Sequence, residues 1–223
     1  MNTVIAKHNG KYQSQRNNAK AYYLHGSSYV DDQGKILFHA KDIDKEEHKL
    51  FDRTSECFIS SGSMFCDALY NAKITKTLVD ELAYKLGVIN NAKGKEDRYY
   101  WSAHERFLDV IIKDKGYDFF IHKVKGNLDQ IKDSIDHGFP VMCSIWIQPW
   151  YPSGKGHIVL IVGYKEDEDR NVTGWIVNDP FGDCLSQYKN QAGEKVYYSQ
   201  KDFYKMINSP EDQPRFMGRV RAK

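Results

Sequence analysis

The sequence predicts an α+β fold in which N-terminal helices pack on a C-terminal antiparallel sheet. Apolar residues recur at helical spacing in segments before residue 139, and short runs rich in β-branched residues, bounded by Gly, Pro and Asp, follow it. Helices that precede strands, instead of alternating with them, favour antiparallel hairpins over a parallel sheet. The 223 residues show no internal repeat and suit a single domain over residues 1–223 with one sizeable core.

Helical spacing is clearest in three segments. Residues 74–87 place Ile or Leu at every fourth position and end in Gly87, and residues 102–116 and 127–138 carry similar apolar stripes. Residues 57–71 are also expected to be helical, although their Ser and Gly residues have poor helix propensity. Small side chains let a backbone pack close to a neighbour, so we expect this helix to lie against the sheet.

Three short apolar runs predict the strands of the sheet: residues 140–147, 157–164 and 174–180. Before them, residues 16–56 are rich in charge and turn signals and contain only a brief strand candidate, residues 35–40. We therefore expect this earlier stretch to be a surface excursion from the domain.

Composition argues against several classes of partner. Lys and Arg number 32 against 30 Asp and Glu, a net charge of +2, which is too weak a bias to indicate nucleic acid or an anionic membrane surface. No stretch approaches the roughly 18 apolar residues of a spanning helix, and the N-terminus lacks the apolar core and cleavage site of a signal peptide. We expect a soluble chain that is made in the cytoplasm without a signal peptide.

The cysteines and histidines show no metal-binding spacing. Cys57, Cys66, Cys143 and Cys184 include no C-x-x-C pair, and no two histidines stand at i, i+4. We therefore expect free thiols, no metal site and no cofactor. Cys66 and Cys143 stand among apolar residues and are interpreted as small core residues.

Cys57 is the strongest candidate for chemistry. It opens the predicted helix 57–71, and a helix N-terminus together with a nearby imidazolium stabilises a thiolate, the nucleophilic form of cysteine. Cys66 lies nine residues further on, which turns it to roughly the opposite side of the helix. The two thiols are therefore not equivalent, and only Cys57 is positioned to react.

His157 is the candidate base. It begins the predicted strand 157–164 behind a turn rich in Gly and Ser, where an imidazole ring would be accessible. The next strand ends in Asn178 and Asp179, and either side chain could orient that ring. Because neighbouring residues of a strand face opposite sides, only one of the two is expected to reach it.

These residues carry a resemblance to a known family. The order C-x-x-S-S-x-S-M, then G-H-I-V-L-I-V-G-Y, then V-N-D-P-F-G-D resembles papain-fold cysteine peptidases related to the bacteriocin-leader peptidases, and within them a free-standing bacterial and phage branch. The resemblance covers residues 11–18, 55–66 and 139–200. It implies a papain-like fold, with Cys57 as the nucleophile, His157 as the base and Asp179 as the residue that orients the ring.

The upstream phrase YQSQRNN adds a candidate for the oxyanion hole. It resembles a Y-x-S-Q-x-D-N segment of that branch, which implies that the Gln15 amide and the Cys57 backbone N–H bind the oxyanion. Gln13 is the competing position. Gln15 and Cys57 stand much further apart than in the family, so residues 20–53 are interpreted as an insertion, and a charged insertion beside the nucleophile could gate it.

The loop before His157 is aromatic. Trp146, Trp150 and Tyr151 would border an active-site cleft, where Trp150 and Tyr151 could hold a sugar or a peptide. The alternative is a loop that tucks its own aromatic rings inward, and both interpretations stay open at this point.

With the resemblance, the leading hypothesis is a thiol hydrolase that cleaves peptide bonds. The resemblance allows bacterial cell-wall peptides, leader peptides at a Gly-Gly site or cytoplasmic peptides as substrates. Cell-wall peptides are favoured, because free-standing members resemble phage endolysins, which act at the wall without a signal peptide once another protein opens the membrane. The alternatives are a catalytically silent papain-fold module that binds a peptide or partner protein, and a thiol-dependent transferase.

Overall fold

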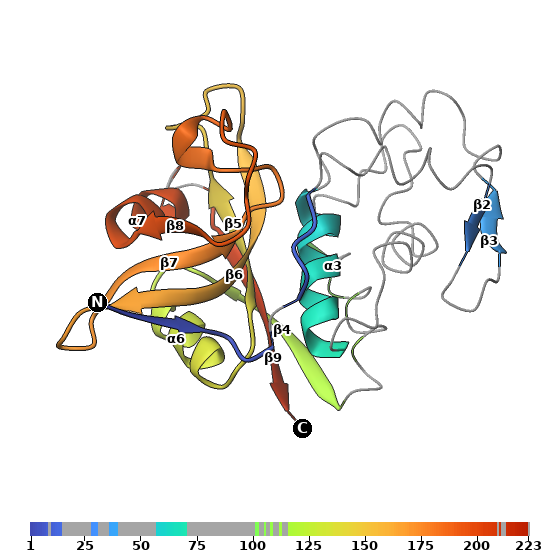
Figure 1. The fold of residues 1–223 in the computed structure, drawn as a ribbon, viewed down its shortest axis with the longest axis horizontal. Helices are drawn as coiled ribbons and strands as arrows, with labels where there is room; N and C mark the ends of the chain where they lie inside the picture. The colour runs from blue at the N-terminus through green and yellow to red at the C-terminus, as the bar shows by residue number, and fades with distance from the viewer. Residues whose placement is uncertain are drawn as a thin grey trace.

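The computed structural model describes most of the C-terminal half of the chain and shorter segments of the N-terminal half (Figure 1). The described residues are 1–8, 10–14, 28–30, 36–39, 57–70, 101–102, 105, 108, 112, 116–208, 210 and 213–222. The predicted helix 74–87 lies outside them.

A seven-stranded antiparallel sheet forms the centre of the fold. Its strands are β1 (Asn2–Ile5), β4 (Tyr117–Lys123), β5 (Val141–Trp146), β6 (Gly156–Glu166), β7 (Val172–Asn178), β8 (Val196–Ser199) and β9 (Phe216–Ala222). Their order is β4-β9-β5-β6-β7-β8, and β1 pairs with the second half of β6. A separate pair, β2 (Ser28–Val30) and β3 (Ile36–His39), falls within the predicted insertion 20–53.

Helices cover both faces of the sheet (Figure 1). Helix α3 (Cys57–Tyr70) packs on one face, and α6 (Leu128–Asp136) and α7 (Gln200–Asn208) pack on the other. Within the described segments, none of the helices is long and apolar enough to cross a membrane.

The apolar sequence of β6 follows from this two-sided packing. Ile158, Leu160 and Val162 enter the core beneath α3, whereas Val159 and Ile161 enter the core beneath α6 and α7. Because alternate residues of a strand face opposite sides, a strand that is covered on both faces is apolar throughout.

Small residues let α3 pack closely, as expected. Ser61 and Ser63 are fully buried, and Ser61 Oγ donates a hydrogen bond of 3.0 Å to the Ile158 carbonyl oxygen of β6. The N-terminal segment also touches the helix, because a Cβ at Gly10 would lie 2.1 Å from the Met64 carbonyl oxygen. Tertiary packing therefore stabilises a sequence that would form a poor isolated helix.

The α+β class and the antiparallel sheet are confirmed. The predicted helices 57–71 and 127–138 correspond to α3 and α6, and the predicted strands 140–147, 157–164 and 174–180 correspond to β5, β6 and β7. In the predicted helix 102–116, Leu108 and Ile112 are helical and fully buried. The sheet is larger than predicted, because β1, β4, β8 and β9 join it, and α7 was not predicted either.

Candidate active site

Helix α3 begins at Cys57 and presents it at the N-terminal end. Cys57 is partly exposed, whereas Cys66, Cys143 and Cys184 are buried. Burial raises the pKa of the Cys66 and Cys143 thiols far above the usual range and raises the pKa of Cys184 to about 12. Of the four thiols, Cys57 is the one that solvent and a substrate can reach.

His157 and Asp179 form a buried pair at one end of the sheet. His157 lies near the start of β6, and Asp179 directly follows β7. His157 Nε2 and Asp179 Oδ1 are 2.7 Å apart, and the two side chains are 5% and 0% exposed. The Cys57 side chain lies near enough to this imidazole to help raise its pKa. Because Nε2 faces the carboxylate, Nδ1 is the ring nitrogen left for a partner such as the Cys57 thiol.

The charge of the imidazole follows from its surroundings. Burial disfavours the charged ring, but the negative charge of Asp179, its hydrogen bond to the ring and the nearby Cys57 side chain outweigh this effect and raise the pKa of His157 to about 10. At neutral pH the ring therefore holds its proton as an imidazolium, which is the partner that a thiolate requires. The arrangement can supply a nucleophile and a proton donor in one contact.

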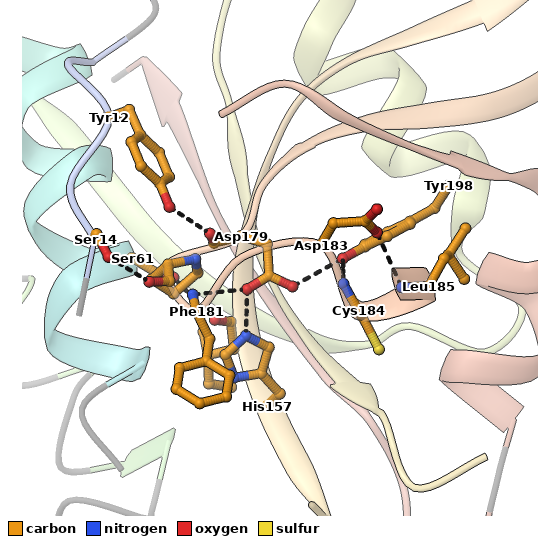
Figure 2. Close-up of polar contacts among 12 residues, drawn as sticks. Tyr12, Ser14, Ser61, His157, Asp179, Phe181, Asp183, Cys184, Leu185 and Tyr198 are labelled. Atoms are coloured by element: carbon orange, nitrogen blue, oxygen red, sulfur yellow. Dashed lines mark hydrogen bonds and ion pairs between the residues drawn. The ribbon is translucent and has the colours of Figure 1, made fainter. Parts of the chain in front are cut away.

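Asp179, and not its neighbour Asn178, reaches the imidazole. Asn178 Oδ1 instead accepts a hydrogen bond of 2.9 Å from the Lys195 N–H. Asp179 Oδ1 also accepts a hydrogen bond of 2.9 Å from the Phe181 N–H, and Oδ2 accepts one of 2.8 Å from the Tyr198 hydroxyl (Figure 2). With the imidazole, three donors therefore fix the orientation of the carboxylate.

The segment 10–14 ties α3 to the loop that carries Asp179. Its first residue packs against the helix. Further along, the Tyr12 hydroxyl donates a hydrogen bond of 2.8 Å to the Asp179 carbonyl oxygen, and Ser14 Oγ donates one of 3.2 Å to the Pro180 carbonyl oxygen (Figure 2). The segment thus bridges the helix that begins at Cys57 and the loop that carries Asp179.

This segment also contains a candidate for the oxyanion hole. Gln15 lies outside the described residues, so its role stays a prediction. Gln13, the competing position, is described, and its buried Oε1 has no hydrogen-bond partner among the described residues. This atom is an acceptor, and an oxyanion needs the N–H groups of the same amide, so the role of Gln13 also stays a prediction.

Aromatic rings line the side of the imidazole. Tyr188 packs edge-on against His157, with ring centroids 6.0 Å apart, and Tyr151 and Phe181 pack against Tyr188 at 5.2 and 4.6 Å. Trp150 and Tyr151 are half-buried and pack against the core beneath α6 and α7. The rings of this loop are therefore partly tucked inward and keep some exposed area.

Sequence reasoning missed three groups that hold the carboxylate and its loop. The Phe181 N–H could have been foreseen, because an Asp that accepts from the N–H two residues later forms the usual Asx turn. Tyr12 and Tyr198 come from distant parts of the chain, and no local pattern marks them. Among the described residues, no group of three or more His, Cys, Asp and Glu is placed to hold a metal ion.

Comparison with known proteins gives the family. A crystal structure described as that of a C39-like peptidase from Bacillus anthracis covers 76% of this chain and 91% of its own, with 13% identity and a TM-score of 0.47, a likeness too distant to carry weight. No curated protein matches the chain at a significant level. Residues 39–206 match the Peptidase_C39 like family, and this range includes Cys57, His157 and Asp179. Because the match spans more than half of the chain, the protein belongs to the Peptidase_C39 like family.

Proposed function

We propose that the protein is a cysteine peptidase that hydrolyses peptide bonds through Cys57, His157 and Asp179. The observation that carries this proposal is the 2.7 Å contact between His157 Nε2 and Asp179 Oδ1, beside a partly exposed thiol at the start of α3. Membership of a peptidase family supports the same reaction class. Together these residues would provide a nucleophile, a base and the group that orients the base.

In the proposed reaction, the Cys57 thiolate attacks the carbonyl carbon of the substrate. The His157 imidazolium then gives its Nδ1 proton to the leaving amine as the C–N bond breaks, which leaves a thioester on Cys57. Water attacks this thioester, His157 takes a proton from the water, and the carboxylic acid product leaves while the thiolate is restored. Asp179 keeps the imidazole in one orientation through both halves of the reaction.

The oxyanion of each tetrahedral intermediate needs hydrogen-bond donors. We assign the Cys57 backbone N–H and one glutamine amide, from Gln15 or Gln13, to this task. The loss of one such donor costs about 100- to 1,000-fold in kcat. Comparing Gln13→Ala with Gln15→Ala identifies the donor, because only the variant that lacks it should lose kcat to this extent while the alkylation of Cys57 stays unchanged.

As the substrate we propose the peptide part of bacterial cell walls, the class that the sequence resemblance favours and one that would make the enzyme endolysin-like. The half-buried rings of Trp150 and Tyr151 support a site for a peptide or a sugar, because Tyr151 contacts Tyr188, which packs against His157. Purified peptidoglycan, a Gly-Gly leader peptide and an unrelated peptide should be incubated with the protein and the products read by mass spectrometry. Cleavage of the leader peptide alone would exclude the wall substrate but keep the peptidase.

The first test of the peptidase itself is alkylation by iodoacetamide as a function of pH, read site by site by mass spectrometry. In the wild-type protein, Cys57 alone should react fast well below about pH 8, and His157→Ala should remove that advantage. The buried Cys66, Cys143 and Cys184 serve as internal controls in the same digest. If Cys57 reacts no faster than Cys184, the peptidase proposal fails, and the site should be tested as a peptide-binding module.

A further inference from the structure

We propose that Tyr198 is a positioning residue of the active site, whose hydroxyl holds the Asp179 carboxylate in the orientation that aligns His157. This inference rests on the function proposed above. It starts from the hydrogen bond of 2.8 Å between the Tyr198 hydroxyl and Asp179 Oδ2 (Figure 2).

The two oxygens of the Asp179 carboxylate have different partners. Oδ1 accepts from His157 Nε2 and from the Phe181 N–H. Oδ2 accepts from Tyr198, and the described part of the chain offers it no other donor. Without the Tyr198 hydroxyl, the carboxylate would be held through one oxygen only and could rotate about its Cβ–Cγ bond. The Tyr198 hydroxyl, by donating to Oδ2, therefore helps to keep Oδ1 facing the imidazole.

Tyr198 is itself fixed by its surroundings. Its side chain is fully buried, and in the register of β7 and β8 it lies opposite Trp175. The Tyr198 hydroxyl oxygen accepts a hydrogen bond of 3.3 Å from the Cys184 N–H, which directs the hydroxyl proton toward Asp179. Burial and the charge of Asp179 raise the pKa of Tyr198 well above its usual range, so the hydroxyl keeps its proton and remains a donor at neutral pH.

A backbone contact holds the strand that carries Tyr198 next to the carboxylate. The Asp179 N–H donates a hydrogen bond of 2.8 Å to the Gly193 carbonyl oxygen, just before β8. A Cβ at Gly193 would lie 1.9 Å from the Asp179 carbonyl oxygen, so only glycine allows the two chains to approach this closely. The start of β8 and the end of β7 are thus joined at the level of the active site.

The test compares Tyr198→Phe with Tyr197→Phe. Both variants remove one hydroxyl from neighbouring positions of β8, but the Tyr197 hydroxyl donates to the Thr173 carbonyl oxygen at 3.0 Å, away from the active site. For each variant, kcat and KM on a cleaved peptide, the pH profile of Cys57 alkylation and the melting temperature should be measured. Near-ultraviolet circular dichroism verifies that each variant is folded under the assay conditions.

We expect Tyr198→Phe to lower kcat by about 10-fold or more with little change in KM, because one hydrogen bond to a charged group is lost. The alkaline limb of the alkylation profile should move to lower pH, since the raised pKa of His157 depends on a carboxylate held at 2.7 Å. Tyr197→Phe should change neither quantity. In an Asp179→Asn background, Tyr198→Phe should have less than about a twofold further effect, because it acts through Asp179.

Equal behaviour of Tyr198→Phe and Tyr197→Phe would overturn the inference. If that result is found while His157→Ala abolishes the fast alkylation of Cys57, the proposed peptidase stands and only the role of Tyr198 fails. If His157→Ala also leaves the alkylation rate of Cys57 unchanged, the proposed function is wrong, and the inference about Tyr198, which rests on it, is wrong as well.

Discussion

The two sides of the candidate active site, that of the proposed base and that of the proposed nucleophile, are built in different ways. On the base side, His157 and Asp179 are buried at one end of the sheet, and three donors fix the carboxylate. On the nucleophile side, Cys57 is partly exposed at the first residue of α3. A base must keep one orientation in surroundings of low dielectric, whereas a nucleophile must be open to a substrate. The sheet provides the first property and the helix end provides the second.

The largest expected effect comes from removing the nucleophile. Cys57→Ala should lower peptidase activity by roughly 10,000-fold or more, because no other thiol can replace it. The melting temperature should change little, since the lost side chain is partly exposed. Activity on the cleaved peptide and thermal unfolding measure the two quantities.

The matched control is Cys66→Ala on the same helix. Cys66 is fully buried, so this change should cost about 1 kcal/mol of the free energy of unfolding while activity is kept. If Cys66→Ala were as inactive as Cys57→Ala, the distinction between the two thiols would be lost.

The next effect is on the base side. Asp179→Asn removes the charge that raises the pKa of His157, so this pKa should fall, and activity should drop by about 100- to 10,000-fold. Histidine titration by NMR and the pH profile of the rate would show both changes. Asn178→Ala is the control, because that side chain bonds to Lys195 and does not contact the imidazole. An unchanged titration in Asp179→Asn would contradict the proposed contact.

Linkage of stability to pH tests the base side separately from the thiol. In Cys57→Ala, which removes the titration of the thiol, Asp179 should still hold the pKa of His157 above its unfolded value of about 6.5. Between the two pKa values the folded state then binds more protons than the unfolded state. The stabilisation that His157 contributes to the free energy of unfolding is therefore complete below about pH 6.5 and is lost as the pH rises through the folded pKa. Urea unfolding between pH 6 and 10 should show this fall, and Cys57→Ala/His157→Gln should not.

The smallest expected effect concerns the packing of α3 on β6. Ser61→Ala leaves the buried Ile158 carbonyl oxygen without its 3.0 Å hydrogen bond and should cost about 1–2 kcal/mol of unfolding free energy. Ser63→Ala is a close match, because Ser63 Oγ is equally buried but has no hydrogen-bond partner within the part of the chain that the structure describes. Removing an unsatisfied hydroxyl should be neutral or stabilising. Urea unfolding measures both variants. If both lose the same free energy of unfolding, the loss comes from the cavity left by the hydroxyl and not from the hydrogen bond.

The sequence predicted the central strands of the sheet better than its edge strands. β5, β6 and β7 were visible because both of their faces are buried, which makes them continuously apolar. β8 and β9 were missed because charged or polar residues interrupt them, as in VYYS and FMGRVRA. Their place in the sheet depends on partners that are distant in the sequence.

The same distinction holds within the site. Cys57 and His157 stand at element ends that local patterns mark, and Asp179 follows a strand in a recognisable turn. Tyr198 carries no such mark, because its hydrogen bond to Asp179 exists only after β8 pairs with β7. Contacts of this kind arise from tertiary structure, so no local pattern could have predicted them.

The hydrogen bond between Tyr12 and the Asp179 backbone also bears on the order of synthesis. Tyr12 leaves the ribosome 167 residues before its acceptor, and a contact across such a separation forms late, because the long loop between its ends must first be closed. The helix that presents Cys57 is likewise made before the strands that carry the base. A nascent chain therefore displays its thiol without an imidazolium, and the proposed peptidase cannot assemble its site until translation has passed β7.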